Sequence, residues 1–235
     1  MKKIFVIAEI GHSHMGNMRT AKLHIDEAKA CGADAAKFQF YDTNKIKKPW
    51  QSRYFELLLS EHNKEEAKEL KEYCDKVGIE FLASAFDVER LGWLEELGVK
   101  RHKVASRSIY EKDMIEGMEK TGKPIIASLG KLDERGIPKI KNAEYLFCVA
   151  EYPTYMTAEM FPSKFGKDEQ YQGFSDHTIG MYWCREAVKR GATIIEKHFT
   201  LSRDLPGNDQ KGSANPTDLK DFVTYCRQLE RGIQY

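Results

Sequence analysis

The stretch that decides the fold of this chain is residues 191–211, which read GATIIEKHFTLSRDLPGNDQK. A short apolar run passes here into alternating charged and imidazole side chains, and a turn with proline and glycine follows. Side chains alternate between the two faces of an extended strand, so Glu196 and His198 share one face and Lys197 points to the other. This pattern is typical of a buried strand whose end forms part of a site.

A second stretch, residues 173–180, reads GFSDHTIG and repeats this design. Its Ser175 and His177 share one face just before a turn into the next helix. Neighbouring parallel strands lie about 4.8 Å apart. If these two strands pair, His177 and His198 can therefore reach the same cation.

Short apolar runs alternate with amphipathic segments along the whole chain, which is the pattern of parallel strands joined by helices. Eight strands are expected, at residues 4–10, 35–40, 80–85, 101–106, 124–128, 145–149, 172–177 and 193–199. Helices are expected after most of them, ending at Gly32 and Gly78 in the first two cases. The helices after the fifth and sixth strands look short or irregular. Eight such units favour a (β/α)8 TIM barrel of the α/β class over an open sheet.

The sequence contains no low-complexity run, no linker and no repeat of fixed period, so residues 1–235 are expected to form a single domain. The longest connection, about residues 41–62, is basic and aromatic and joins the second strand to its helix. Connections of this length are usually functional.

Composition narrows the classes of partner. The 37 basic and 36 acidic residues give a formal charge of +1, which indicates neither nucleic-acid binding nor an anionic membrane surface. The apolar runs are too short to span a membrane and no signal-peptide pattern is present, so a cytoplasmic protein is expected. The five cysteines are widely spaced without a CxxC motif, which disfavours a disulfide framework or a zinc cluster. A small molecule is the expected partner.

Polar side chains recur at the expected carboxyl ends of the strands, where TIM-barrel active sites lie. They are Glu9, Lys37, Gln39, Ser84, Lys103, Ser128, Ser175, His177, Glu196 and His198. A single serine or histidine is commonly a satisfied core residue. Burying two lysines, two acids and two imidazoles by chance would carry a large desolvation penalty, so we interpret the set as one solvated site.

The residue types in this set indicate chemistry. Two neutral imidazoles with oxygen ligands suit Mn, Co, Fe or Zn, which polarise a carbonyl as a Lewis acid. Lys37 and Lys103 suit an anionic substrate that carries carboxylate and phosphate, with hydroxyls such as that of Ser106 completing a phosphate site. Glu9, which shortly precedes His12 and His14, is placed for proton transfer.

A Schiff-base aldolase is the alternative on the same fold. It would use Lys37, Lys103 or Lys197 and would not need the histidine pair. A third reading, from outside the enzymes, is a non-catalytic barrel that binds a sugar phosphate, since fold alone does not establish activity.

The motifs AEIG, KFQ, SDHT and EKHFT, with the longer stretches around them, resemble the sialic acid synthase family of N-acetylneuraminate synthase and its pseudaminic, legionaminic and spore-coat relatives. The similarity extends over nearly all of the chain. It implies a (β/α)8 barrel that condenses phosphoenolpyruvate with an open-chain amino-sugar aldehyde, releasing phosphate and a nonulosonic acid. It also implies a divalent metal ion, with Mn expected and Mg or Co as alternatives, and a homodimer as a candidate assembly.

The resemblance assigns roles to residues of this sequence. It places the metal ligands at His177 and His198, and the catalytic acid at Glu9. The phosphoenolpyruvate contacts correspond to Lys37, Lys103, Ser106, Ser128 and Ser175. The sugar contacts correspond to Gln39, Tyr152 and Asp209, and the strand-end reading adds Ser84 and Glu196 to the substrate-binding set.

The chain departs from the family pattern at three places. Ala150 stands where the family usually has Asn or Ser, and Arg107 and Lys131 stand where it mostly has Gly and Met. Most members also continue into an antifreeze-like domain that supplies an arginine to a partner's sugar site, whereas the barrel alone is expected here. We expect Arg107 and Lys131 to bind the phosphate or an acceptor with its own negative charge, the alternative being exposed loop charges.

Overall fold

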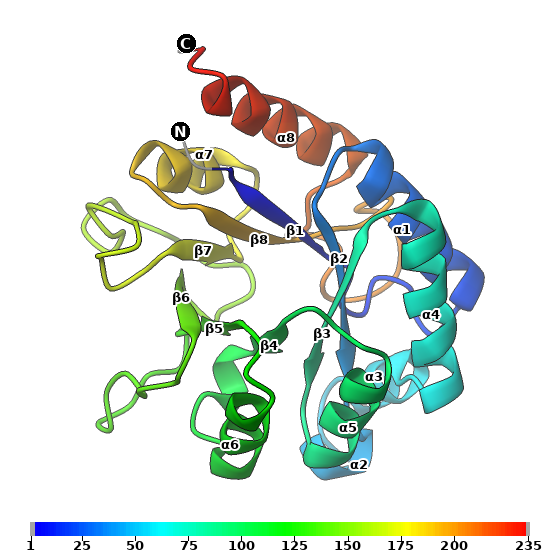
Figure 1. Ribbon diagram of the computed structural model, residues 1–235. Coiled ribbons are helices and arrows are strands. Elements are labelled where there is room, and N and C mark those ends of the chain that lie inside the picture. The colour runs from blue at the N-terminus through cyan, green and yellow to red at the C-terminus, as the bar shows by residue number, and fades with distance from the viewer. Residues whose placement is uncertain (1–2, 234–235) are drawn as a thin grey trace.

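Eight parallel strands close into a barrel in the computed structural model, which describes residues 3–233 (Figure 1). The strands are β1 Phe5–Glu9, β2 Ala35–Phe40, β3 Glu80–Ala85, β4 His102–Val104, β5 Ile125–Ser128, β6 Ala143–Cys148, β7 Gly173–Asp176 and β8 Ile194–His198. Each pairs with the next along the chain, and β8 pairs with β1. The predicted (β/α)8 fold is confirmed. Residues 1, 2, 234 and 235 of the expected domain lie outside the described residues.

Helices surround the barrel on most of its circumference (Figure 1). They are α1 Met18–Ala30, α2 Thr43–Ile46, α3 Tyr54–Ser60, α4 Lys64–Val77, α5 Val88–Glu96, α6 Lys112–Lys120, α7 Tyr182–Lys189 and α8 Pro216–Glu230. Local sequence fixes their ends. Asn63 and Glu66 form a capping box at the start of α4, which ends at Gly78 in the left-handed conformation. Asn215 caps α8, where Pro216 holds the first helical position.

One side of the barrel lacks helices. Within residues 3–233, segments 129–142 and 149–172 run as turns and irregular chain after β5 and β6 (Figure 1), which confirms the irregularity expected there. Aromatic side chains cover β6 and β7 here instead of a helix. The ring centroid of Phe161 lies 5.8 Å from that of Phe147 on β6 and 5.1 Å from that of Phe174 on β7. None of the helices described for the chain is long and apolar enough to cross a membrane.

Two details differ from the sequence expectation. The fourth strand is shorter than residues 101–106, because the chain turns into a 3-10 helix at Ser106–Ser108. The long connection after β2 holds two short helices, α2 and α3, that the sequence pattern did not predict.

Strand register decides which side chains enter the barrel. The Cα partners include Glu9 with Lys37 and Ser175 with Glu196, so side chains at these positions point inward together. Beneath them lies a buried apolar layer formed by Ile7, Ala35, Leu82, Ile126, Leu146 and Ile194. Polar groups at the carboxyl ends of the strands thus rest on an apolar floor.

Candidate active site

A cavity of about 350 Å³ opens above this floor, at the carboxyl end of the barrel. Its volume falls in the usual range for ligand pockets, roughly 300–1,000 Å³. Among the expected site residues, its lining includes Glu9, Lys37, Gln39, Lys103, Ser106, Arg107, Ser128, Lys131, Tyr152, Ser175, His177, Glu196 and His198. The structure therefore brings together side chains from β1, β2, β4, β5, β7 and β8 and from the loops that follow the strands.

Two expected residues lie outside this lining. Ser84 is fully buried, and within residues 3–233 its hydroxyl has no hydrogen-bond partner. Asp209 lines an adjoining cavity of about 170 Å³ together with Tyr152, His177 and His198. Because these last three residues border both cavities, they form the wall between them.

Two lysines and two carboxylates make a buried ionic cluster at the base of the main cavity. Lys37 Nζ lies 2.5 Å from Glu9 Oε2 and 3.7 Å from Glu196 Oε2. Lys103 Nζ lies 3.6 Å from Glu196 Oε1. The two positive and two negative formal charges of the cluster balance. An incoming anion would therefore share the ammonium groups of Lys37 and Lys103 with the carboxylates of Glu9 and Glu196.

Neutral groups complete this cluster. Gln39 donates to Glu9 at 2.5 Å, Ser175 donates to Glu196 at 2.9 Å, and Lys103 donates to the Ser128 hydroxyl at 2.7 Å. These contacts hold the charged groups in place before any substrate arrives, which lowers the entropy lost on binding.

The two lysines differ in their proton affinity. Burial lowers the pKa of Lys37, but the carboxylates of Glu196 and Glu9 outweigh it and the net pKa is raised. Burial also lowers the pKa of Lys103, and Glu196 opposes it only in part, so that pKa stays below its usual value. Lys37 is thus a fixed ammonium, whereas Lys103 has the lowered pKa that a Schiff-base lysine needs.

Glu196 remains a carboxylate in this setting. Burial would raise its pKa, but the ammonium groups of Lys103 and Lys37 lower it to about 2. It therefore serves as the countercharge of both lysines rather than as a proton donor.

Lys197 does not belong to the cavity. Its side chain lies on the outer face of the barrel strands, where Nζ is 2.9 Å from Asp176 Oδ2 and only 1% of the side chain is exposed. Lys197 as a Schiff-base nucleophile is therefore wrong, because its amine cannot reach a substrate inside the barrel.

The rings of His177 and His198 lie 5.5 Å apart, centroid to centroid, at the ends of neighbouring strands. His177 Nδ1 donates to the Val149 carbonyl at 2.8 Å, which leaves the lone pair on Nε2, 2.9 Å from the Tyr152 hydroxyl. Burial, with the neighbouring His198, lowers the pKa of His177 to about 4, so the imidazole is neutral.

His198 Nδ1 is buried and has no hydrogen-bond partner within residues 3–233. The nearest carboxylate oxygen of Asp209 is 3.8 Å from it. Two adjacent imidazoles, one held neutral with a lone pair facing the cavity and one with an unpartnered buried nitrogen, fit the donor set of a divalent transition metal.

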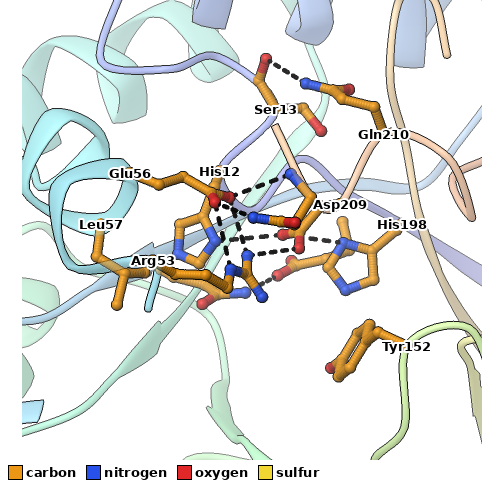
Figure 2. A network of polar contacts seen from close by, with 12 residues as sticks. His12, Ser13, Arg53, Glu56, Leu57, Tyr152, His198, Asp209 and Gln210 are labelled. Carbon is orange, nitrogen blue, oxygen red and sulfur yellow. Dashed lines mark hydrogen bonds and ion pairs between the residues drawn. The ribbon is translucent and has the colours of Figure 1, made fainter. Parts of the chain in front are cut away.

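A second polar network joins the long connection after β2 to the loop after β8 (Figure 2). Arg53 Nη2 lies 2.9 Å from both Glu56 Oε1 and Asp209 Oδ1, and His12 Nδ1 lies 3.2 Å from Asp209 Oδ2. Burial raises the pKa of Asp209, but the contact with His12 and the charge of His198 outweigh it, and the pKa falls far below its usual value. Asp209 is thus fixed as a carboxylate beside the histidine pair.

Sequence reasoning missed Arg53 and Glu56. The only signal was the length and basic, aromatic character of the connection that carries them. Arg53 adopts the left-handed conformation (φ 67°) just before α3, which no periodicity in the sequence predicts.

Side-chain oxygen and nitrogen atoms of His12, Glu56 and Asp209 lie within 4.8 Å of one another, as metal ligands do. However, the Arg53 guanidinium already bridges both carboxylates. Within the described residues no lysine or arginine side chain occupies the corresponding position beside His177 and His198. The histidine pair is therefore the better candidate for a metal.

His14 was expected near Glu9 but points away from the cavity. Its Nε2 lies 3.2 Å from Nε2 of His62, and the two rings stack at 4.4 Å under the long connection. His12, by contrast, does line the cavity. Of the two histidines after β1, only His12 is within reach of the site.

The chain matches the model of the NeuB family over residues 24–234. An uncharacterized protein of Methanocaldococcus jannaschii is 38% identical over 97% of this chain and 71% of its own length. The N,N'-diacetyllegionaminic acid synthase of Campylobacter jejuni is 33% identical over 99% of this chain and 78% of its own length. The N-acetylneuraminate-9-phosphate synthase of Mus musculus is 30% identical over 97% and 71%.

Among solved structures, the N-acetylneuraminic acid synthetase of Leptospira borgpetersenii, in complex with citrate, superimposes with a TM-score of 0.87 at 30% identity. The alignment covers 100% of this chain and 86% of that one. The likeness therefore includes the whole barrel and the loops that line the cavity.

Proposed function

This chain belongs to the NeuB family, and from that premise we propose that it is a metal-dependent synthase of nonulosonic acids. Its named relatives are synthases of the sialic acid type, so it is a transferase that forms a carbon–carbon bond with phosphoenolpyruvate. The second substrate is an open-chain amino-sugar aldehyde, and the products are a 2-keto-3-deoxy acid and phosphate. The observation that carries the proposal is the histidine pair, with its unpartnered ring nitrogen on His198, beside the buried lysine cluster.

Phosphoenolpyruvate fits the lysine cluster. Lys37 and Lys103 provide charge-assisted hydrogen bonds, and Ser106, Ser128 and Ser175 provide hydroxyls for carboxylate and phosphate oxygens. Ser106 is held in place because its oxygen accepts from the Gly130 N–H at 3.0 Å. A Cβ at position 130 would lie 2.9 Å from that oxygen, so glycine is needed for this close approach.

The reaction forms a bond between C3 of phosphoenolpyruvate and the aldehyde carbon, while the aldehyde oxygen takes a proton. Water then adds to the cationic C2, and phosphate leaves as the 2-keto group forms. A divalent cation held by His177 and His198, manganese in this proposal with magnesium or cobalt as alternatives, would polarise the aldehyde carbonyl. Glu9 moves a proton to or from the acceptor hydroxyl or the attacking water.

The acceptor sugar would lie over phosphoenolpyruvate. Tyr152 and Asp209 border the cavity wall beside the histidine pair, and Gln39 projects from β2 next to Glu9. Their hydroxyl, carboxylate and amide groups are suited to sugar hydroxyl and acetamido groups.

Phosphate release from phosphoenolpyruvate, measured with a panel of aldoses and with Mn, Mg or Co, tests the proposal directly. We expect release only with an aldose and a divalent cation. Release that persists in chelator, with a borohydride-trapped adduct at Lys103, would establish the aldolase alternative. Binding of sugar phosphates without turnover under any of these conditions would establish the non-catalytic one.

We expect Lys103→Met to weaken phosphoenolpyruvate binding about 10- to 100-fold, because a hydrogen bond to a charged group contributes about 1.5–3 kcal/mol. The dissociation constant can be measured by calorimetry without acceptor. Lys68→Met, on the exposed face of α4, is the matched control and should bind as wild type does. Equal affinity in both variants would remove Lys103 from the phosphoenolpyruvate site.

The cavity rim carries three cations, Lys47, Arg107 and Lys131, that have no carboxylate oxygen within 4.0 Å in the described part of the chain. The hydrogen bond from Gly130 to Ser106 brings the segments of Arg107 and Lys131 together. We propose that these two side chains bind the phosphate or a negatively charged group on the acceptor.

If they bind the acceptor, the protein should prefer an acidic or phosphorylated aldose over neutral N-acetylmannosamine, and Arg107→Ala or Lys131→Ala should reduce that preference about tenfold. The measurement is kcat/KM for a neutral and an anionic acceptor in the three proteins. A raised KM for phosphoenolpyruvate with unchanged preference would assign both residues to the phosphate. If neither the acceptor preference nor the KM for phosphoenolpyruvate changes, Arg107 and Lys131 are exposed loop charges that bind no substrate.

We also propose that residues 1–235 act as one domain, in the cytoplasm, and as a homodimer. Exposed apolar side chains on the connection after β2, including Trp50 and Phe55, support self-association, since exposed apolar patches commonly mark interfaces.

A further inference from the structure

Lys197 and Asp176 form an ion pair on the outer face of β8 and β7, away from the cavity. Each residue is about 1% exposed, and the Nζ to Oδ2 distance is 2.9 Å. The proposed chemistry uses neither. Replacing a buried ion pair by apolar residues is often neutral or stabilising, so stability alone is a poor account of this one.

The pair holds the backbone on both sides of His177. Asp176 Oδ1 accepts from the Thr178 N–H at 2.8 Å, and Lys197 Nζ donates to the Thr178 carbonyl. Asp176 and Thr178 are the two chain neighbours of His177. One lysine therefore reaches both the residue before His177 and the residue after it.

The same lysine directly precedes His198. Asp176 and Lys197 are Cα partners in the pairing of β7 with β8, so the histidines that follow them extend from matched positions. Because side chains alternate along a strand, the ion pair occupies the outer face and His198 the inner face. The distance between the histidines depends on how these two strand ends are held together.

The surroundings make the contact rigid. Cys184 of α7, a helix that packs against β7, donates its thiol to Asp176 Oδ2 at 3.0 Å. The Thr154 N–H donates to the His177 carbonyl at 3.0 Å from the other side. The His177 backbone is thus held both by the ion pair and by the loop after β6.

We propose that Asp176 and Lys197 are positioning residues that set the spacing of His177 and His198 for one shared divalent cation. The inference rests on the proposed function, because it assumes that the histidine pair binds metal. An ion pair on the outer face of the barrel strands would thus act on the histidine pair of the inner face.

Lys197→Met tests the inference through metal affinity. We expect the dissociation constant for Mn²⁺, measured by calorimetry well below the unfolding temperature, to rise about 10- to 100-fold, as for loss of other residues that orient metal ligands. Arg101→Met is the matched control, because it removes a partly buried ion pair at the opposite end of the barrel. In this pair Arg101 Nε lies 2.7 Å from Glu80 Oε1. It should lower the unfolding temperature and leave Mn²⁺ affinity unchanged.

The double variant Asp176→Leu/Lys197→Met separates positioning from stability. It leaves no unpaired buried charge, so we expect its unfolding temperature to recover toward that of wild type while its Mn²⁺ affinity stays weak. Wild-type affinity in the double variant would overturn the inference and leave the pair a purely structural one.

A metal-free measurement keeps this test independent of the proposed function. We expect a nuclear Overhauser effect between the ring protons of His177 and His198 in wild type and its loss in Lys197→Met. If wild type binds no metal but this effect is lost in the variant, the proposed function fails and the positioning role stands. An unchanged effect in the variant would overturn the positioning role itself.

Discussion

His177→Ala and His198→Ala are each expected to abolish turnover and tight binding of a divalent cation while the barrel stays folded. Each removes one of the two imidazoles whose centroids lie 5.5 Å apart at the cavity wall. A single remaining imidazole cannot hold the cation against water. Both rings lie at the cavity wall and neither belongs to the apolar core, so we expect the unfolding temperature to fall only modestly.

The measurements are metal content after dialysis, phosphate release and the unfolding temperature. His24→Ala is the matched control, because His24 is buried on α1 and its ring bonds only to the Thr20 carbonyl of its own helix among the described residues. It should keep both metal and activity. Full activity of both cavity variants, without residual metal, would refute the metal site.

The second large effect is expected for Glu9→Gln. Glu9 lies between Lys37 and Gln39, 2.5 Å from each, and borders the cavity. Glutamine keeps the shape and an oxygen that can accept from Lys37, but it cannot carry a proton. We expect kcat to fall about 10²- to 10⁴-fold, the usual contribution of general acid–base catalysis, with little change in KM for phosphoenolpyruvate.

Steady-state kinetics with saturating acceptor check this expectation. Glu144→Gln is a suitable control, since it removes a carboxylate from β6 at the far end of the barrel. It should leave kcat unchanged. A loss confined to KM would make Glu9 a binding residue.

Much of the site could be predicted because strand geometry is regular. Alternation along β8 placed Glu196 and His198 on the inner face and Lys197 on the outer one, and the ion pair with Asp176 confirms this. On sequence grounds Lys197 nevertheless counted among the candidate Schiff-base lysines, and its buried ion pair excludes it. Most site residues on strands thus followed from period and register, whereas Ser84 of β3 is fully buried and lies outside the cavity lining.

Residues on loops did not follow in this way. Arg53 reaches Asp209 across 156 positions of sequence, through a backbone conformation that has no repeating pattern. The stacking of His14 on His62, which turns His14 away from Glu9, likewise depends on the path of the long connection. Such contacts are set by tertiary packing, so sequence periodicity carries no information about them.

The placement of Arg53 also bears on competition between sites for dissolved ions. His12, Glu56 and Asp209 form a ligand set of their own beside the histidine pair, and an ion that entered there would occupy Asp209, a proposed contact of the acceptor sugar. The Arg53 guanidinium lies 2.9 Å from each carboxylate and is tethered to the chain, so a dissolved cation has to compete with a group that is already in place. Arg53 thereby acts as a built-in counterion that occupies this ligand set, so that dissolved cations would be left to the proposed metal site at the histidine pair.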